Sequence, residues 1–413
     1  MAEVSIKDAV SIFDESLRAH DLCALSKRVA KRPLVLYFGR ATFSDNTKYL
    51  FLRDLARQRS YDVLWCTFDR DLHGQLTAAG LPSLDMSANI DVTIDLLLHA
   101  AAAVFCVNPN ESLRGSVALN ACLDGARKVQ LWHGVSVKHL LLRLASYLGV
   151  RDVNLRRAFE FASRADYVLS TAPHFDRFWR EVFGCRRLVR AGFPRNEVLL
   201  REATDLEMIG AVLPPAVDEG LKRARAAGRK SILVVPTWQR GASTFLTETD
   251  FIVRTVQFAR EHDAFVVLKM HPAYYKQARA SGRSDCLEML DPGVDIYPSL
   301  NRFDALVTDY SSIMFDFLLT GRPVLSLDLD PGQHQSFEPD FSLVPDIEFR
   351  TRFTPQNYEA QLRRVLWDDN RAAQRAEMVD RIFASDPRSA CDGLLALLDE
   401  LVAQAVADDY SVV

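Results

Sequence analysis

Short runs of apolar and β-branched residues alternate along the chain with longer stretches in which apolar residues recur at helical spacing. This alternation is typical of βαβ units, in which helices join parallel strands. The first series of predicted strands comprises Leu34–Phe38, Val63–Thr67, Ala103–Val107, Lys128–Trp132, Tyr167–Thr171 and Arg187–Ala191. The second series comprises Ser231–Pro236, Phe265–Met270, Val294–Ile296, Ala305–Thr308 and Val324–Leu327. The chain is therefore predicted to be an α/β protein with two parallel sheets.

A charged stretch separates the two series of strands. It runs from 202 to 230 and contains Pro214, Pro215 and Gly228, which are typical of linkers and turns. We expect two Rossmann-like domains of similar size, 1–210 and 211–413. The last part, 355–413, has helical patterns and no strand pattern, and we expect its helices to pack back across the first domain.

Composition and charge narrow the class of protein. With 48% hydrophobic and 25% charged residues, the 413-residue chain is an ordinary globular sequence and not a disordered one. The 50 Lys and Arg against 54 Asp and Glu, a net charge of -4, disfavour a nucleic-acid partner. The seven cysteines are scattered without a C-x-x-C pair, which favours free thiols and a cytoplasmic protein. Neither a signal peptide nor a membrane-spanning run is visible in the pattern.

Two histidines follow predicted strands directly. His133 comes after the strand ending at Trp132 and precedes Gly134, and His271 comes after the strand ending at Met270. Because ligands of parallel sheets bind at the carboxyl ends of the strands, both residues are candidates for proton transfer. A strand-end histidine that only bonds to the backbone is the alternative for each.

A third strand end carries Asp309, Ser311 and Ser312, and the helix that follows it carries Asp316. The two serines stand where helix N-cap residues belong, so capping alone would explain them. Alternatively, their hydroxyls and the helix N-terminus form a phosphate site, and Asp316 faces the same site. The two explanations are compatible with each other.

Two further loops complete the set of binding candidates. The turn after Ala191 presents Arg195, whose guanidinium suits a phosphate, although an exposed surface arginine is the commoner meaning of such a turn. The strand ending at Pro236 presents Thr237 and Trp238. Asp328 and Asp330 fit loop acids better than metal ligands, so we predict no metal site and no cofactor, and leave dependence on a divalent metal open.

In this order, these segments resemble the CDP-glycerol glycerophosphotransferase family of teichoic-acid and capsule polymer synthases. The resemblance covers roughly 34 to 330. The matching motifs are Phe43–Phe51 (FSDNTKYLF), Trp132-His133-Gly134, Gly192-x-Pro194-Arg195-Asn196, Pro236-Thr237-Trp238, His271-Pro272, and Thr308 to Ser312 with Asp316.

The resemblance implies a GT-B-like pair of domains that face each other across a cleft, with a CDP-linked donor bound mainly to the second domain. An acceptor hydroxyl would attack the β-phosphorus of CDP-glycerol or a related CDP-polyol, and CMP would leave. At the matching positions, His133 would be the base, and Asp316 would bind donor hydroxyls. His271, Arg195, Ser311 and Ser312 would contact the pyrophosphate. We also assign to donor binding Gly134, Thr237, Trp238 and Asp309.

The acceptor implied by the resemblance is an anionic polymer or a lipid-linked hydroxyl. The segment Lys138–Arg164 mixes basic and apolar residues and predicts either a peripheral contact with the inner face of the cell membrane or an ordinary packed helix pair with a basic face. A nucleotide-sugar glycosyltransferase on the same fold and a noncatalytic polymer-binding scaffold are the competing functions. The choice between a glycerol, a ribitol and a sugar phosphate donor, and between primase and polymerase, stays open at this stage.

Overall fold

The computed structural model describes residues 6–137, 164–237, 245–270, 285–328 and 340–410. Within them the chain forms two compact units. Unit 1 comprises Met1–His133, Leu141–Arg195 and Ser385–Val413, and unit 2 comprises Gly134–Leu140 and Asn196–Ala384. The chain thus passes between units directly after His133 and directly after Arg195. The predicted boundary between 210 and 211 stays a prediction, and the compact units differ from it by placing 196–210 with unit 2 and 385–413 with unit 1.

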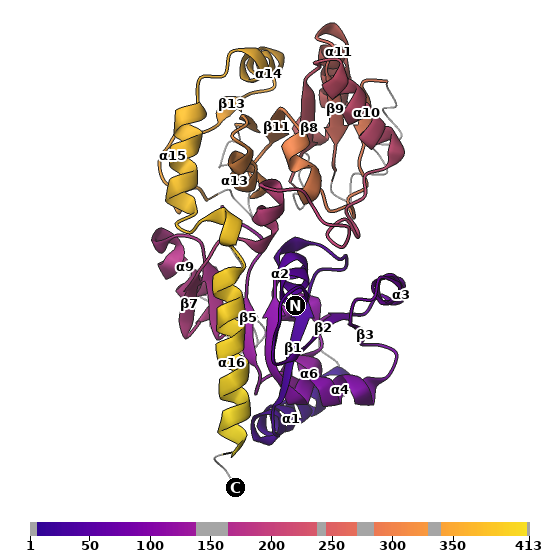
Figure 1. Ribbon diagram of the computed structural model, residues 1–413, viewed down its shortest axis with the longest axis vertical. Coiled ribbons are helices and arrows are strands. Elements are labelled where there is room, and N and C mark those ends of the chain that lie inside the picture. The colour runs from indigo at the N-terminus through magenta and orange to yellow at the C-terminus, as the bar shows by residue number, and fades with distance from the viewer. Residues whose placement is uncertain (1–5, 138–163, 238–244, 271–284, 329–339, 411–413) are drawn as a thin grey trace. The chain divides into compact units, whose positions relative to one another are not determined.

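The described part of unit 1 contains a seven-stranded parallel sheet in the order β3-β2-β1-β4-β5-β6-β7 (Figure 1). Its strands are β1 (Arg32–Phe38), β2 (Asp62–Thr67), β3 (Ser83–Asp85), β4 (Ala100–Phe105), β5 (Arg127–Gln130), β6 (Tyr167–Ser170) and β7 (Arg187–Arg190). Central strand β4, with the sequence AAAAVF, is buried along its whole length. A strand covered on both faces reads as a continuous apolar run, which explains why the sequence pattern located it.

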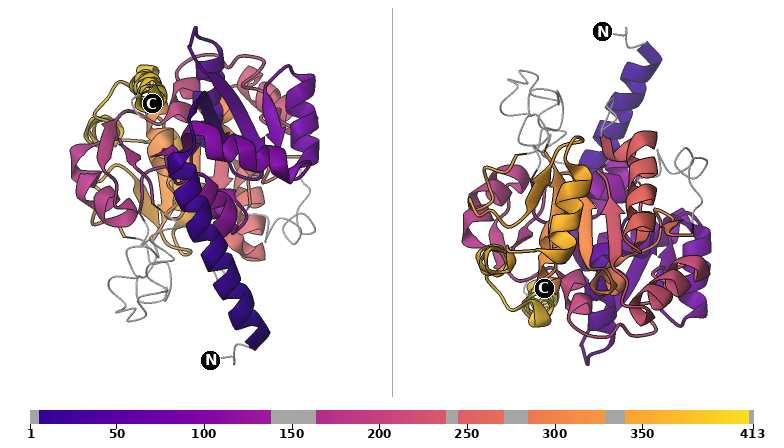
Figure 2. Two further views of the ribbon diagram at one scale, coloured as in Figure 1. Left: turned by 90° about the horizontal axis from the view of Figure 1, so that it is seen from below. Right: turned by 90° about the horizontal axis from the view of Figure 1, so that it is seen from above.

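Helices connect and cover these strands. They are α1 (Ile6–Arg28), α2 (Asp45–Leu55), α3 (Arg70–Ala78), α4 (Ile90–His99), α5 (Pro109–Ser112), α6 (Val117–Cys122), α9 (Asp176–Phe183) and α16 (Asp392–Tyr410), with 3-10 turns at Pro173–Phe175, Pro194–Leu199 and Pro387–Ser389. The carboxyl-terminal part of α1 packs on α6, where the Ser26 hydroxyl donates to the Cys122 carbonyl (2.6 Å). Figure 2 shows the amino-terminal part of α1 extending away from the rest of unit 1.

The C-terminal helix α16 belongs to unit 1 and contacts β1 and β4 (Figure 1). Its buried leucines, including Leu394, Leu398 and Leu401, cover apolar surface of the sheet. Arg57 beyond α2 fastens this helix with two hydrogen bonds to the Asp399 carboxylate, both 2.7 Å long. The prediction that the terminal helices pack back on the first domain is confirmed for α16.

The described part of unit 2 contains a six-stranded parallel sheet in the order β10-β9-β8-β11-β12-β13. Its strands are β8 (Ser231–Val235), β9 (Phe265–Leu268), β10 (Leu287–Met289), β11 (Ala305–Thr308), β12 (Val324–Leu327) and β13 (Thr351–Phe353). Its helices are α10 (Pro215–Ala226), α11 (Thr249–Glu261), α13 (Ile313–Phe317), α14 (Tyr358–Trp367) and α15 (Ala372–Ile382), with 3-10 turns at Phe245–Thr247, Tyr297–Arg302 and Leu318–Thr320.

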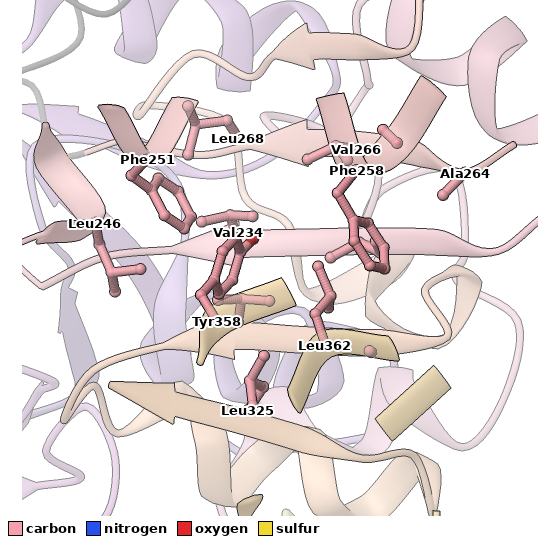
Figure 3. Close-up of a cluster of buried hydrophobic side chains, with 14 of the residues drawn as sticks. Val234, Leu246, Phe251, Phe258, Ala264, Val266, Leu268, Leu325, Tyr358 and Leu362 are labelled. Atoms are coloured by element: carbon pink, nitrogen blue, oxygen red, sulfur yellow. The ribbon is translucent and has the colours of Figure 1, made fainter. Parts of the chain in front are cut away.

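A single apolar cluster holds α11 and α14 on this sheet (Figure 3). Val234 of β8, Val266 of β9 and Leu325 of β12 lie against Phe251, Phe258, Tyr358 and Leu362 of the two helices. On α10, a side chain at Gly220 would collide with the Phe265 ring, so only glycine permits this approach of α10 to β9. The expected architecture of two parallel α/β sheets is confirmed.

One predicted strand is wrong. The stretch Val294–Ile296 forms a turn, in which the Asp295 carboxylate accepts a hydrogen bond from the Tyr297 backbone N–H (3.2 Å) and the Asp295 N–H donates to the Gly210 carbonyl. These bonds use backbone groups that a strand would need for its neighbours. The edge position is occupied instead by β10, three residues long.

Candidate functional site

His133 lies just beyond the carboxyl end of β5, as predicted, and side chains fix the turn that delivers it. The Gln130 amide donates to the Val107 carbonyl (2.8 Å) and its oxygen accepts from the Trp132 N–H (2.9 Å), so the ends of β4 and β5 are joined. Trp132 adopts φ +57 and Gly134 adopts φ +130. Because side chains disfavour a positive φ, glycine at 134 lets the chain turn away from the sheet immediately after the histidine.

Two buried side chains hold the backbone around this histidine. Asn46 near the start of α2 donates to the Trp132 carbonyl (2.8 Å), and Arg195 donates to the His133 carbonyl (2.9 Å). Arg195 is only 4% exposed, and its other terminal nitrogen donates to the Asp45 carboxylate (2.7 Å). We call Asp45, Asn46, Trp132, His133 and Arg195 the histidine cluster. Within this cluster Arg195 bonds to Asp45 and to the His133 backbone, and its predicted contact with the pyrophosphate stays a prediction.

The His133 ring is half-buried at the edge of this cluster. Its Nδ1 lies 3.3 Å from the carbonyl oxygen of Cys106, and its ring lies 4.2 Å from that of Trp132 between centroids. A carbonyl oxygen accepts only, so the hydrogen of the neutral ring belongs on Nδ1 and Nε2 carries the lone pair. This contact is compatible with the tautomer that a general base would need, and the assignment of His133 as the base stays a prediction.

In unit 2, Asp309 joins the ends of two neighbouring strands. Its carboxylate, 1% exposed, accepts hydrogen bonds from the Thr237 N–H (3.0 Å to Oδ2) and hydroxyl beyond β8, and from the Tyr310 N–H (2.7 Å) beyond β11. The Thr308 hydroxyl donates to the Val235 carbonyl beside it (2.6 Å). Thr237 and Asp309 thus shape the loop ends at the carboxyl edge of this sheet. Their assignment to donor binding stays a prediction.

Ser311 and Ser312 precede helix α13 and are both half-buried. Within the part of the chain that the structure describes, Ser312 at the N-cap position makes no side-chain cap hydrogen bond. Side-chain capping therefore does not account for Ser312. The predicted role of both serines in binding the donor pyrophosphate is untested by these contacts.

Asp316 is fully buried. Its carboxylate accepts from the Asn196 amide (3.0 Å) and the Tyr297 hydroxyl (2.7 Å). We call Thr237, Asp309, Ser311, Ser312 and Asp316 the serine cluster. Arg195 and Asn196, which are adjacent in sequence, thus serve different clusters, Arg195 in unit 1 and Asn196 in unit 2. Binding of donor hydroxyls by Asp316 stays a prediction.

Two predicted site residues, His271 and Trp238, lie outside the described residues, and so does most of the segment Lys138–Arg164. The expected convergence of the two histidines on one ligand therefore stays a prediction. No group of three or more metal-ligating side chains occurs within the described ranges. Asp328 is exposed after β12, and Asp330 is not described. No helix in the described part of the chain is long and apolar enough to cross a membrane.

Sequence reasoning missed three residues that support the clusters. Tyr297 donates to Asp316 and shows no motif of its own. Asp45, which pairs with Arg195, and Asn46 both belong to the FSDNTKYLF segment, which carried part of the family resemblance, so a signal was available for these two residues.

Thr237 offers a direct test of how much the Asp309 contact stabilises unit 2. Replacing Thr237 with valine removes a hydroxyl that donates to a buried carboxylate, and hydrogen bonds to charged groups contribute about 1.5–3 kcal/mol. We expect Thr237→Val to lower the free energy of unfolding by about 2 kcal/mol in urea titration. The exposed Thr249→Val is the matched control, with an expected change below about 0.5 kcal/mol. An equal effect of both variants would contradict the structural role of this contact.

Two all-parallel α/β units, each carrying polar side chains at the carboxyl ends of its strands, define a GT-B-like transferase fold. The wall teichoic acid polymerase TagF shares it: one solved structure covers 96% of this chain and 99% of its own with a TM-score of 0.67 and 19% identity. Another structure of the same polymerase is a histidine-to-asparagine variant soaked with CDPG.

The family model of CDP-glycerol:poly(glycerophosphate) glycerophosphotransferase matches residues 22–384, and the chain belongs to this family. The teichoic acid glycerol-phosphate transferase of Staphylococcus aureus is 28% identical over 213 residues, 49% of this chain and 52% of that protein. The teichoic acid poly(glycerol phosphate) polymerase of Bacillus spizizenii is 26% identical over 231 residues, 54% of this chain and 52% of that protein. The chain spans about half the length of these curated relatives. The resemblance found in the sequence motifs is confirmed.

Proposed function

We propose that the protein transfers a polyol phosphate, specifically glycerol phosphate, from a CDP-linked donor to a hydroxyl of a growing teichoic-acid-like or capsular polymer. The observation that carries this proposal is the family match over 22–384, which includes both the histidine cluster and the serine cluster. The donor CDPG in a TagF structure supports the choice of CDP-glycerol. The seven free cysteines support a reducing, cytoplasmic location of the reaction.

In the proposed reaction, an acceptor hydroxyl oxygen attacks the β-phosphorus of CDP-glycerol. The new P–O bond makes a phosphodiester, the bond from the β-phosphorus to the bridging oxygen breaks, and CMP leaves with that oxygen. Nε2 of His133 accepts the proton of the attacking hydroxyl. Phosphoryl transfer depends mainly on positioning and on charge stabilisation, which we assign to His271, Ser311 and Ser312. Thr237, Trp238, Gly134 and Asp309 form the surrounding donor pocket in this proposal.

The identity of the released nucleotide tests this function. We expect CMP, and no nucleoside diphosphate, when the protein is incubated with CDP-glycerol and a glycerol-phosphate acceptor, followed by chromatography of the nucleotides. CDP-ribitol and a panel of nucleotide sugars are the matched alternative donors. Release of a nucleoside diphosphate from a nucleotide sugar would identify a glycosyltransferase instead, and turnover of no donor would favour the noncatalytic scaffold.

A further inference from the structure

A basic pocket of about 420 Å³ lies in unit 1, at the opposite end of the strands from His133. Lys31 precedes β1 and Arg186 precedes β7, whereas His133 follows the end of β5. Because all strands of the sheet are parallel, the pocket and the histidine cluster lie at opposite edges. Ala405 of α16 and Lys27 of α1 also line it, where these helices approach each other (Figure 1). Its volume falls within the range of about 300–1,000 Å³ that is usual for small-ligand sites.

Positive charge dominates the lining of this pocket. Seven of its lining residues are basic and two, Asp124 and Asp166, are acidic. The basic residues are Lys27, Arg28, Lys31, Arg127, Lys128, Arg164 and Arg186. Asp124 pairs with Lys27 (2.5 Å) and Asp166 with Arg186 (3.5 Å), so the two carboxylates cannot neutralise the remaining cations. A protein of net charge -4 thus concentrates an excess of positive charge in one recess, which favours an anionic ligand.

Two of these cations are held inside the pocket wall. Lys31 donates to the Ser26 and Leu98 carbonyls (both 2.6 Å), and Lys128 donates to the Asn120 amide oxygen (2.7 Å). Burial lowers the pKa of each lysine to about 8, which means that the neighbouring carboxylates do not offset the loss of water. An anion in the pocket would add a favourable Coulomb interaction with both ammonium groups.

The other lining groups favour one kind of anion. The carboxylates of Asp124 and Asp166 can accept hydrogen bonds from hydroxyl groups, whereas the cations bind phosphate oxygens. None of the large exposed apolar side chains, such as Leu17, Leu25 or Ile90, lines the described pocket, so it lacks the apolar rim of a membrane-inserting surface.

From these observations we propose that the pocket binds a phosphodiester segment of a polyol-phosphate chain, remote from the hydroxyl that reacts. This inference rests on the proposed function, because it identifies the ligand as a distal part of the acceptor polymer. The pocket then retains the anionic chain by alternating phosphate and hydroxyl contacts. Its occupancy raises the affinity for long acceptors without taking part in the transfer step.

The experiment compares two double variants of exposed arginines. Arg28→Gln with Arg164→Gln removes two charges from the pocket, and Arg70→Gln with Arg177→Gln removes two charges elsewhere on unit 1. The probe is a synthetic oligo(glycerol phosphate), titrated calorimetrically into each full-length protein. We expect the pocket variant to bind it at least about tenfold more weakly, because charge-assisted hydrogen bonds are lost. We expect the control variant and the binding of CDP-glycerol to match the wild type.

Further binding measurements distinguish this proposal from its alternatives. Vesicles of anionic phospholipid that bind through the pocket, while the oligomer does not, would overturn the proposal in favour of a membrane contact. Equal binding of the oligomer by all three proteins would also overturn it. Loss of oligomer binding in the pocket variant would support this inference even if the protein released no CMP. The failure of the proposed function and the failure of this inference are therefore distinguishable. If inorganic phosphate competes with the binding of the oligomer and glycerol does not, this would support recognition of the phosphate groups.

Discussion

Replacing His133 with asparagine is expected to slow the release of CMP by about 10²–10⁴-fold, the usual contribution of a general base. We expect the turnover number to fall, because the asparagine amide cannot accept the proton of the attacking hydroxyl. Stability should hardly change, since Asn46 and Arg195 bond to the backbone oxygens of Trp132 and His133 and not to the imidazole. Steady-state CMP release and thermal unfolding, measured on the same preparation, check both halves of the prediction.

His174→Asn is the matched control for this experiment. His174 is an exposed histidine of unit 1 outside the histidine cluster, so its replacement should leave turnover within about twofold of wild type. A second diagnostic is the pH profile of turnover, in which the acidic limb should disappear from the residual activity of His133→Asn. Undiminished turnover in His133→Asn would assign the base to another residue, and His271 would be examined next.

The central strands and the position of His133 could be predicted from the sequence, because they depend on local patterns. Strands β1, β4 and β8 are apolar on both faces, and a buried strand ending in a polar residue places that residue at the sheet edge. The three-residue strands β3, β10 and β13 lie at sheet edges and read SLD, LEM and TRF. An edge strand forms hydrogen bonds to a neighbouring strand on one side only, and these three short strands show no apolar run like that of the central strands.

The supporting contacts of the site could not be predicted, since they join residues far apart in the chain. Arg195 and Asp45 are separated by 150 positions, and Thr237 and Asp309 by 72. A turn containing arginine looks the same in sequence whether its guanidinium meets a phosphate or a buried carboxylate. Only the fold determines which anion lies within reach.

The ion pair changes how charge is distributed in the proposed reaction. Asp45 neutralises much of the Arg195 charge and also contacts Arg40 (3.2 Å). We therefore expect Arg195 to contribute less to the charge stabilisation of a pyrophosphate than its motif predicts. In the proposed reaction we assign this stabilisation to Ser311, Ser312 and His271, and we expect Arg195 to hold the His133 backbone in place.

Replacing Arg195 with methionine should accordingly lower the free energy of unfolding by about 3 kcal/mol, because removal of one member of a buried ion pair leaves the other uncompensated. Arg40→Met is the matched control, because Arg40 is the second arginine that contacts Asp45. The Arg40 side chain is 42% exposed, so we expect the free energy of unfolding to fall by no more than about 1 kcal/mol. Urea titrations of both variants measure the difference.

Kinetics of Arg195→Met, measured where the variant remains folded, separate positioning from donor binding. If Arg195 acts through the His133 backbone, turnover falls while the KM for CDP-glycerol stays within about twofold, because ground-state donor contacts are intact. If Arg195 contacts the pyrophosphate instead, as the motif predicts, KM should rise by about tenfold or more through loss of a charge-assisted hydrogen bond. Combining Arg195→Met with Asp45→Asn removes the stranded charge with a residue that tolerates the φ of +70 at this position, and should restore part of the stability without restoring turnover. Recovery of turnover in this double variant would contradict the positioning role, since the carbonyl of His133 still lacks its donor.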